Sequence, residues 1–565
     1  MTTTAPIRRR DFLATAGAAL AALGCGGQMG NPGRARWDLV LRGGTIVDGS
    51  GGAPIEGDVA IERGRIAALG RSLAGRASEE IDARGLVIAP GFIDIHSHAD
   101  GTLFEDPRAE SVIRQGVTTV VVGQDGGSQG PAREHHDDAA ERIRHALRTG
   151  HQFDSIGDFL AGVDTLPPGV NLATMVGLGT IRAAIIGDAN RPATRPELMR
   201  MHALVGAALS QGACGVSSGL EYVPGAFASR DELATLCQPL AEARLPYATH
   251  MRNEDDQLLE SIDESIAVAR TAGCPLQISH LKTQGPRNWP KIDAALDRIE
   301  KAHAAGLDIA FDRYPYVAYQ TGLTNLFPAW SRDGGTERFL ARVRDASTAM
   351  RIRDEALAKV ELIGGWDNVQ ITSVRNDGDR TVEGKRLGAW AKASGADPYE
   401  AAVGLLERSG GNVGMVGFAM SEDNIARFLA HPRGMVCSDG GAFATDGPAR
   451  RGVPHPRALG SFPRVLSRYV RERHVLSLED AVRKMSAFPA SRVRLTDRGM
   501  LREGFAADVV VFDPATVTDR ATFEEPYRYA DGIRVVIVNG TIALRDGQRS
   551  ERRGGRALRP VEQGR

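Results

Sequence analysis

The chain has 565 residues, enough for about two to four domains or for one large barrel with additions. Its hydrophobic content of 42% and charged content of 25% are ordinary for a globular protein. Acidic and basic residues nearly cancel, giving a formal net charge of -1, and no basic stripe is present. This charge balance argues against nucleic acid as a partner.

The N-terminal residues have the pattern of an export signal. A run of arginines in residues 7–13 precedes an acidic residue and Phe12, and an alanine-rich stretch follows to Leu23. That stretch is about half as long as a bilayer-spanning helix, so it predicts a twin-arginine signal within residues 1–35 and not an anchor helix. Cys25 lies in a box that resembles a lipoprotein cleavage site. We therefore expect export to the periplasm or cell surface. A lipid on Cys25 is the predicted link to the membrane. The alternative is a basic N-terminal arm without a targeting role.

Short apolar strands are predicted at both ends of the chain. They cover residues 38–41, 45–48, 59–62 and 65–69 near the start, and 508–512 and 534–538 near the end. The third and fourth flank Arg63-Gly64, which is typical of a hairpin turn. Because the two ends match in composition, we predict one small β-sandwich domain built from residues 36–89 and 500–550, followed by a tail over 551–565.

The centre of the chain alternates apolar strands with amphipathic helices, of which residues 256–272 are an example. The predicted strands are 92–95, 119–122, 173–176, 215–217, 247–249, 276–279, 308–311 and 435–437. Eight strands with helical crossovers predict an α/β fold, a parallel (β/α)8 barrel of the TIM type over residues 90–333 and 415–499. Residues 334–414 interrupt the alternation and are predicted to form an inserted subdomain.

Ligand-type side chains follow several of these strands. His96 and His98 are two residues apart after the first barrel strand, so both imidazoles can point the same way and meet one cation. Asp125 follows the second strand among glycines, and His250 and His280 each end a strand. Singly, each has an ordinary alternative as a surface pair, a turn residue or a structural donor. Their coincidence at separate strand ends, where barrel sites lie, predicts a metal site.

Asp439 follows the last predicted barrel strand in the sequence Cys437-Ser438-Asp439-Gly440. An aspartate in such a turn is ordinarily part of the turn itself. At the mouth of a metal-binding barrel, a carboxylate can also take a proton from a metal-bound water and return it to a leaving nitrogen. We predict that Asp439 is this catalytic residue.

Together these motifs resemble the D-aminoacylase (N-acyl-D-amino-acid deacylase) family of the amidohydrolase superfamily. The resemblance covers about residues 38–540. It rests on the segments PGFIDIHSH (90–98), SSGLEY (217–222), SHLK (279–282), DRYPY (312–316), SDG (438–440), HPR (455–457) and GSFPR (460–464).

The resemblance implies a metal-dependent hydrolase that releases a D-amino acid from an N-acyl-D-amino acid. It implies one tight zinc on Asp125, His250 and His280. His96 and His98 would belong to a second, weaker position, so that one or two divalent ions bind.

The resemblance also implies residues that contact the substrate. Lys282, Tyr314 and Arg457 match positions that hold the substrate carboxylate, and Tyr222 matches one near the scissile carbonyl. The fork of a guanidinium suits a carboxylate, which supports Arg457. A solvated lysine is the alternative for Lys282, and ordinary packing is the alternative for the two tyrosines.

The chain departs from the family pattern in two places. The best-known members have cysteine, within Gly-Asn-Cys-Gly, where this chain has Asp125. Because a carboxylate is a harder donor than a thiolate, the number and identity of the ions stay open. The family often has Gly-His-Gly where this chain has Gly177-Leu178-Gly179, so any role of that histidine is lost.

Three other functions compete with the deacylase. A D-dipeptidase or peptidoglycan-fragment amidase, acting on L-Xaa-D-Xaa, would suit an exported protein. A ring-opening amidohydrolase is disfavoured because no lysine occupies the usual bridging position. A metal-free scaffold on the same fold is disfavoured because it would need none of the predicted ligands. The expected partner is in every enzymatic case a small molecule.

Overall fold

The computed structural model describes residues 37–132 and 153–560. The predicted export signal and Cys25 lie outside the described residues, so export and lipidation stay predictions. Among the described residues, none of the helices combines the length and the apolar character that crossing a bilayer would require.

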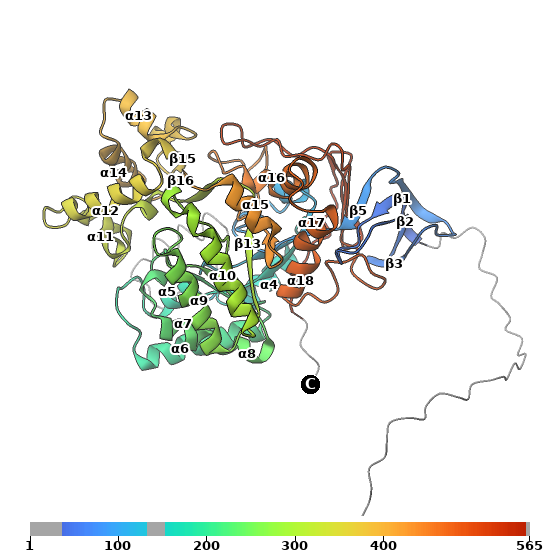
Figure 1. The fold of residues 1–565 in the computed structure, drawn as a ribbon, viewed down its shortest axis with the longest axis horizontal. Helices are drawn as coiled ribbons and strands as arrows, with labels where there is room; N and C mark the ends of the chain where they lie inside the picture. Colours follow the sequence, from blue (N-terminus) through green and yellow to red (C-terminus); the bar gives the residue numbers. More distant parts are fainter. Residues whose placement is uncertain (1–36, 133–152, 561–565) are drawn as a thin grey trace, which may run out of the picture.

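Strands from both ends of the chain form one nine-stranded sheet beside the barrel (Figure 1). They are β1 (Trp37–Ile46), β2 (Ile55–Glu62), β3 (Arg65–Gly70), β4 (Ala77–Asp82), β5 (Val87–Pro90), β18 (Val509–Phe512), β19 (Ile533–Val538), β20 (Thr541–Arg545) and β21 (Gln548–Arg549). The two ends join where β18 pairs antiparallel with β5. Leu41, Val59 and Val511 belong to one buried apolar cluster, so strands of both termini enclose a common core. The β-domain predicted from both termini is confirmed.

The barrel strands are β6 (Phe92–Asp94), β7 (Val117–Val122), β8 (Asn171–Thr174), β9 (Val176–Gly177), β10 (Val216–Gly219), β11 (Tyr247–His250), β12 (Leu276–Ile278), β13 (Ile309–Arg313) and β17 (Gly434–Val436). Neighbouring strands pair in parallel, in the orders β6-β7-β8 and β9-β10-β11-β12-β13-β17. Only Met175 separates β8 from β9. Beyond β17, the Asp439 amide donates to the His96 carbonyl and the His98 amide to the Gly440 carbonyl, each at 2.9 Å. These bonds close the ring, and the predicted (β/α)8 barrel is confirmed.

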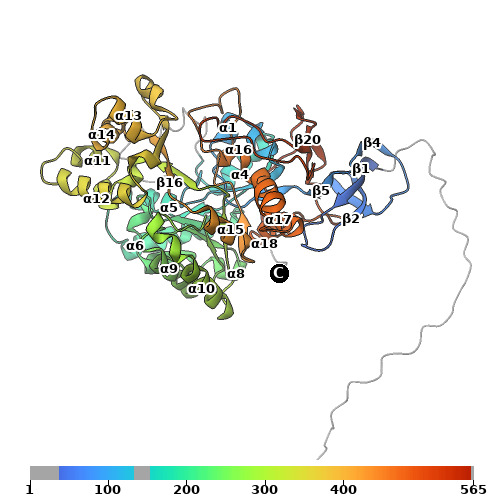
Figure 2. The same cartoon turned by 45° about the horizontal axis from the view of Figure 1, so that its top comes forward.

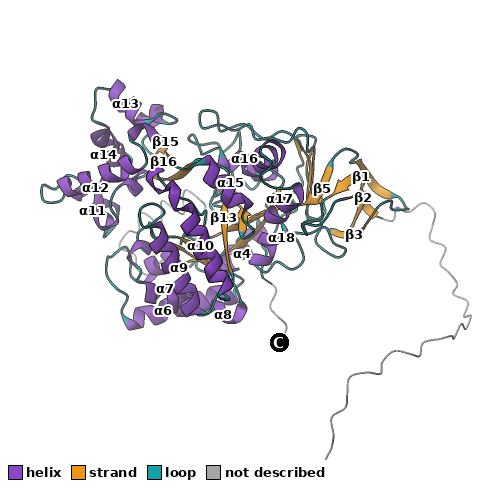
Figure 3. Ribbon diagram, in the orientation of Figure 1, coloured by secondary structure: helices purple, strands orange, loops and turns teal. Residues whose placement is uncertain are grey.

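Helices lie outside the barrel strands (Figure 3). α9 is amphipathic, as predicted: Ile262, Ile266 and Ala269 are buried against the strands. The helices outside the inserted unit are α1 (Thr102–Glu105), α2 (Glu110–Ile113), α4 (Ile156–Thr165), α5 (Leu178–Ile185), α6 (Arg195–Ser210), α7 (Arg230–Cys237), α8 (Leu240–Ala243), α9 (Leu258–Ala272), α10 (Ile292–Ala304), α15 (Glu422–Ala430), α16 (Arg457–Arg464), α17 (Leu478–Met485) and α18 (Ala487–Arg492), with short helical turns η1 (Gly225–Phe227) and η2 (Pro286–Lys291) and the π-helical stretch η7 (Val465–Glu472).

Between β13 and β17 the chain forms an inserted unit, on the side of the barrel away from the nine-stranded sheet (Figures 1 and 2). Its three-stranded antiparallel sheet has the order β14-β16-β15. The unit comprises β14 (Ala318–Gly322), η3 (Leu323–Leu326), η4 (Ala329–Arg332), α11 (Thr336–Arg342), α12 (Ala349–Leu362), η5 (Trp366–Asn368), β15 (Val369–Val374), η6 (Asp377–Val382), α13 (Leu387–Ala393), α14 (Pro398–Arg408) and β16 (Val413–Phe418). Its sheet extends past both ends of the segment 334–414, because β14 pairs with a strand almost a hundred residues later.

Candidate metal centre

Three of the predicted site residues sit at strand ends in an uncommon backbone conformation. Asp125, His280 and Asp439 have φ angles of 52°, 34° and 50°, in the left-handed region that costs a non-glycine residue about 1–3 kcal/mol. Neighbouring bonds hold these turns; the His280 amide, for example, donates to Asp312 Oδ1 at 2.8 Å. A Cβ on Gly219 would lie 2.0 Å from the Asp125 carbonyl oxygen, so only glycine permits this approach of two strand ends.

The carboxylate of Asp125 lies within 3.8 Å of all four predicted histidine ligands. Its Oδ1 lies 3.4 Å from His96 Nε2 and 3.4 Å from His280 Nε2. Its Oδ2 lies 3.5 Å from His98 Nε2 and 3.8 Å from His250 Nδ1. The structure therefore brings all four predicted histidine ligands to one carboxylate.

The ligand atoms form two groups that share Asp125, each with its atoms within 4.8 Å of one another. One group is Asp125 with His250 and His280, whose facing nitrogens are 3.0 Å apart. The other is Asp125 with His96, His98 and Asp439. Two nitrogens on one tetrahedral zinc are about 3.3 Å apart, which is close to this spacing. The family resemblance implies two metal positions, with His96 and His98 at the second; Asp439, which we predicted as the catalytic residue, lies in the same group as these two histidines.

Unpartnered atoms indicate that the site fits a metal ion. Both ring nitrogens of His96 and Oδ1 of Asp125 are buried without a hydrogen-bond partner. Buried polar atoms almost always have partners, so this concentration at one place requires an explanation. Imidazole nitrogens and carboxylate oxygens are zinc ligands, and a divalent cation would satisfy His96 Nε2 and Asp125 Oδ1 together, while His96 Nδ1 faces Asp312 Oδ1 at 3.6 Å.

The charges of the site also favour a cation. Burial by itself would raise the pKa of Asp125, but His96 and His280 hold it well below its usual value. Burial lowers the pKa of His250, yet Glu254 and Asp125 outweigh this effect and raise it to about 10. The carboxylates thus draw positive charge into the cluster, and a metal ion competes with protons for these positions.

Asp439 contacts both His98, in the second ligand group, and Arg457. Its Oδ1 is 3.1 Å from His98 Nε2, and its Oδ2 is 2.7 Å from the Arg457 guanidinium. Burial would raise the pKa of Asp439, but Arg457 and His98 lower it far below the usual range, so the carboxylate is ionised. Arg457 begins α16 and lies 4.7 Å from the centre of the Tyr314 ring, whose buried hydroxyl has no partner.

The other two predicted substrate contacts lie near the first ligand group. Tyr222 packs on His250 with ring centres 4.7 Å apart. Lys282 is buried behind His280, with its Nζ 2.6 Å from both oxygens of Glu254 and 2.7 Å from His280 Nδ1. Because its ammonium already has a carboxylate partner, the contact of Lys282 with a substrate carboxylate stays a prediction.

Comparison with known proteins agrees with this geometry. The amidohydrolase family model matches residues 79–295 and 425–544, more than half of the chain. The chain belongs to the amidohydrolase family. The resemblance stated from its motifs is thereby confirmed, and the unmatched segment between the two ranges contains the inserted unit.

This amidohydrolase has close relatives of known activity. It is 37% identical over 517 residues to N-acyl-D-glutamate deacylase and 36% identical over 528 residues to N-acyl-D-aspartate deacylase, both from Alcaligenes xylosoxydans xylosoxydans. These matches cover 92% and 93% of this chain and 96% of each relative. The crystal structure of N-acyl-D-glutamate deacylase from Bordetella bronchiseptica, complexed with zinc and a phosphonate inhibitor, matches with a TM-score of 0.79 and 36% identity, over 93% of this chain and 99% of that one.

Sequence reasoning missed two acidic residues of this amidohydrolase site. Glu254 Oε1 lies 3.1 Å from His280 Nδ1, and Glu221 Oε2 lies 3.5 Å from His250 Nε2. Each is on the ring side away from Asp125, where a carboxylate can fix the tautomer and orientation of a metal-binding imidazole. The available signal was position: Glu254 comes four residues after His250, and Glu221 two residues after the end of β10.

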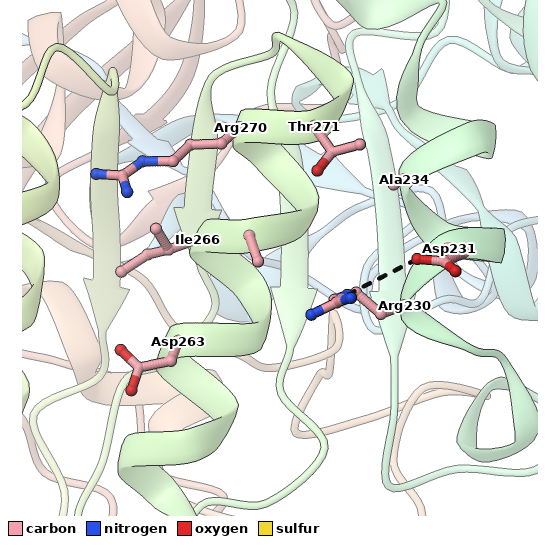
Figure 4. Close-up of a pocket in the computed structure, with 8 residues that line it drawn as sticks. Arg230, Asp231, Ala234, Asp263, Ile266, Arg270 and Thr271 are labelled. Atoms are coloured by element: carbon pink, nitrogen blue, oxygen red, sulfur yellow. Dashed lines mark ion pairs between the residues drawn. The ribbon is translucent and has the colours of Figure 1, made fainter.

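A surface hollow of about 500 Å³ lies elsewhere on the amidohydrolase barrel (Figure 4). Its lining comes from the outer helices α7 and α9, including Arg230, Asp231, Asp263 and Arg270. Arg230 pairs with its neighbour Asp231 at 3.8 Å. No residue of the metal centre lines this hollow, so we assign it no part in the chemistry.

Proposed function

We propose that this protein is a zinc-dependent N-acyl-D-amino-acid deacylase, which hydrolyses the amide to a carboxylate and a free D-amino acid. The main observation in support is that two sets of imidazoles share the carboxylate of Asp125, and that Asp439 lies beside one of these sets. The relatives support it, since two are deacylases of N-acyl-D-glutamate and N-acyl-D-aspartate.

Asp125, His250 and His280 would hold one ion, and His96, His98 and Asp439 would join Asp125 around a second. When bound, zinc lowers the pKa of a coordinated water towards about 7 and polarises the amide carbonyl. Aspartate at position 125 is a harder donor than thiolate, so zinc is proposed here on the strength of the imidazoles and of the zinc-bound relative.

Asp439 performs the proton transfers. Its ionised carboxylate accepts the proton of the attacking water and later delivers it to the departing amine nitrogen. Arg457 keeps Asp439 charged and oriented through one guanidinium nitrogen. The buried Nε of Arg457 has no hydrogen-bond partner and is available to the α-carboxylate of the substrate.

Two anchoring points select the D-isomer. Arg457 and Tyr314 would hold the α-carboxylate, while Tyr222, packed on His250, would lie beside the scissile carbonyl. With both groups fixed, only one configuration at Cα leaves room for the side chain. Selectivity thus follows from the distance between two anchors and not from any single residue.

Released amine, measured over a panel of N-acetyl-D- and N-acetyl-L-amino acids, tests this function. The panel includes acidic D side chains, because of the two relatives, and L-Xaa-D-Xaa dipeptides, because exported hydrolases meet cell-wall fragments. We expect hydrolysis of N-acetyl-D-amino acids and none of their L-isomers. Hydrolysis of L-isomers alone would refute the proposal, while cleavage of the dipeptides would extend the acyl part to an aminoacyl group.

We also propose that the protein is exported by the twin-arginine route and anchored by a lipid on Cys25. The arginines of residues 7–13 and the box around Cys25 support this. Replacing Arg9 and Arg10, the pair directly before Asp11 and Phe12, by lysine should retain the protein in the cytoplasm, whereas Arg34→Lys, in the linker, should not. Cys25→Ala should move exported protein from the membrane to the soluble fraction; unchanged fractionation would contradict the lipid anchor.

A further inference from the structure

The side chain of Glu221 lies between the metal centre and the inserted unit. Its Oε2 is 3.5 Å from His250 Nε2, on the barrel side. The same oxygen accepts a hydrogen bond from Asn325 Nδ2 at 3.1 Å, and Oε1 lies 3.8 Å from Lys359 Nζ. Asn325 belongs to η3 and Lys359 to α12, both parts of the inserted unit. One mostly buried carboxylate therefore contacts both parts of the molecule.

The orientation of the His250 ring defines what Glu221 can do. Nδ1 of His250 faces Asp125 and His280, so this is the nitrogen that would bind an ion of the first ligand group. An imidazole that binds a metal through Nδ1 is neutral and carries its one proton on Nε2. That nitrogen is buried and has no hydrogen-bond partner. Glu221 Oε2 is the nearer of the two carboxylate oxygens within reach of it.

The second carboxylate, Glu254, is already engaged. It lies 3.8 Å from His250 Nε2, but only 3.1 Å from His280 Nδ1 and 2.6 Å from the Lys282 ammonium. Glu254 is therefore the carboxylate partner of His280, and Glu221 is the carboxylate available to His250. Each histidine of the first ligand group has a carboxylate of its own.

The inserted unit holds Glu221 by its backbone as well. Arg332, in η4, donates from its guanidinium to the Glu221 carbonyl at 3.0 Å. Lys359 is itself fixed by Asp255, 2.5 Å away. On the barrel side, the amide of Leu220 donates to the His250 carbonyl at 3.0 Å, which keeps the loop in register with the histidine. Donors of the inserted unit thus set where the Glu221 carboxylate sits.

We propose that Glu221 is a positioning residue through which the inserted unit controls zinc affinity at His250. Asn325 and Lys359 hold the carboxylate, the carboxylate fixes the Nε2–H tautomer and the ring orientation of His250, and Nδ1 is thereby presented to the ion. This inference rests on the proposed zinc-dependent function. It assigns to the inserted unit a part in assembling the metal centre.

Zinc affinity, measured by competition with a chromophoric chelator, tests the proposal. Glu221→Ala should weaken zinc binding by about 10- to 100-fold, as loss of such partners of metal ligands does, and Glu221→Gln, which keeps an acceptor, by less. Asn325→Ala changes no charge and should still weaken binding by about threefold to tenfold, the value of one hydrogen bond.

Two matched variants control for general effects. Glu110→Ala removes another buried carboxylate, paired with Arg114 and Arg549 outside the metal centre. Asn412→Ala removes another asparagine of the inserted unit, whose side-chain amide donates to the nearby Gly410 carbonyl. Both should leave zinc affinity within twofold of the parent.

The outcomes separate this inference from the proposed function. Glu221→Ala and Asn325→Ala with zinc affinities within twofold of the parent would overturn the inference and leave the deacylase proposal standing. A parent protein that binds no zinc would overturn both. Circular dichroism reports whether each variant is folded; should Glu221→Ala fail to fold, Asn325→Ala decides, since it alters one hydrogen bond without changing charge.

Discussion

The guanidinium of Arg457 lies 2.7 Å from Oδ2 of Asp439, while Oδ1 of the same carboxylate faces His98 at 3.1 Å. The proposed catalytic base is thus held between a permanent cation and the second metal position. Arg457 lowers the pKa of Asp439 far below its usual range, so the base is ionised at neutral pH.

Arg457→Met should move the acid limb of kcat/KM to higher pH. Asp439 works as the ionised base, so activity is lost as pH falls through its pKa. Losing a contacting cation raises the pKa of an aspartate by about one to three pH units, and the limb follows in that direction. Arg464→Met, on the same helix but paired with Asp519, is the control. A higher KM with an unmoved acid limb would show that Arg457 binds substrate only.

Asp439→Asn should lower kcat by about 10²- to 10⁴-fold, because the variant loses its general base and acid. The first ligand group does not include Asp439, so one zinc per chain should remain. Steady-state rates and metal analysis on the same sample check both statements. A kcat within tenfold of the parent would remove Asp439 from the proton transfers.

Asp125→Cys should increase the preference for zinc over manganese. A thiolate is a softer donor than the carboxylate that now bridges the two ligand groups, and soft donors favour zinc. Competition between the two ions, followed by metal analysis, measures the change. An unchanged zinc-to-manganese ratio would mean that the four imidazoles alone decide which ion binds.

Gly219→Ala should destabilise the fold and weaken zinc binding together. The new methyl group would lie 2.0 Å from the Asp125 carbonyl oxygen, so the strand end that carries Asp125 must move, at a cost of about 1–3 kcal/mol. Gly206→Ala, in helix α6 with open space around the new methyl group, should raise stability by up to about 1 kcal/mol. Urea unfolding measures both. Equal stability of the two variants would contradict the close approach.

The barrel and the ligand set could be predicted because their signals are local. Each apolar strand can be recognised from a few consecutive residues. The parallel topology then brings the strand ends that carry His96, Asp125, His250 and His280 to one face of the barrel. Asp439 follows the same rule on the last strand. Strand position and residue type together were sufficient to predict that these residues lie close to one another.

The residues behind the ligands could not be predicted in this way. Glu221 lies on a loop, and its partners Asn325 and Lys359 are more than a hundred residues away in an inserted unit whose sheet pairs β14 with β16. The burial of Lys282 beside Glu254 likewise depends on the loop after β11. Loop conformation and non-local pairing leave no periodic pattern in the sequence, so these contacts became visible only in the folded structure.

Zinc titration of chelator-stripped protein, followed by release of D-amino acid from its best N-acetyl-D substrate, tests the central claim most directly. We predict no activity without metal, recovery that saturates at one or two zinc ions per chain, and no recovery in His250→Ala at the same zinc concentration. Full activity in the stripped protein, or equal recovery in His250→Ala, would contradict the account.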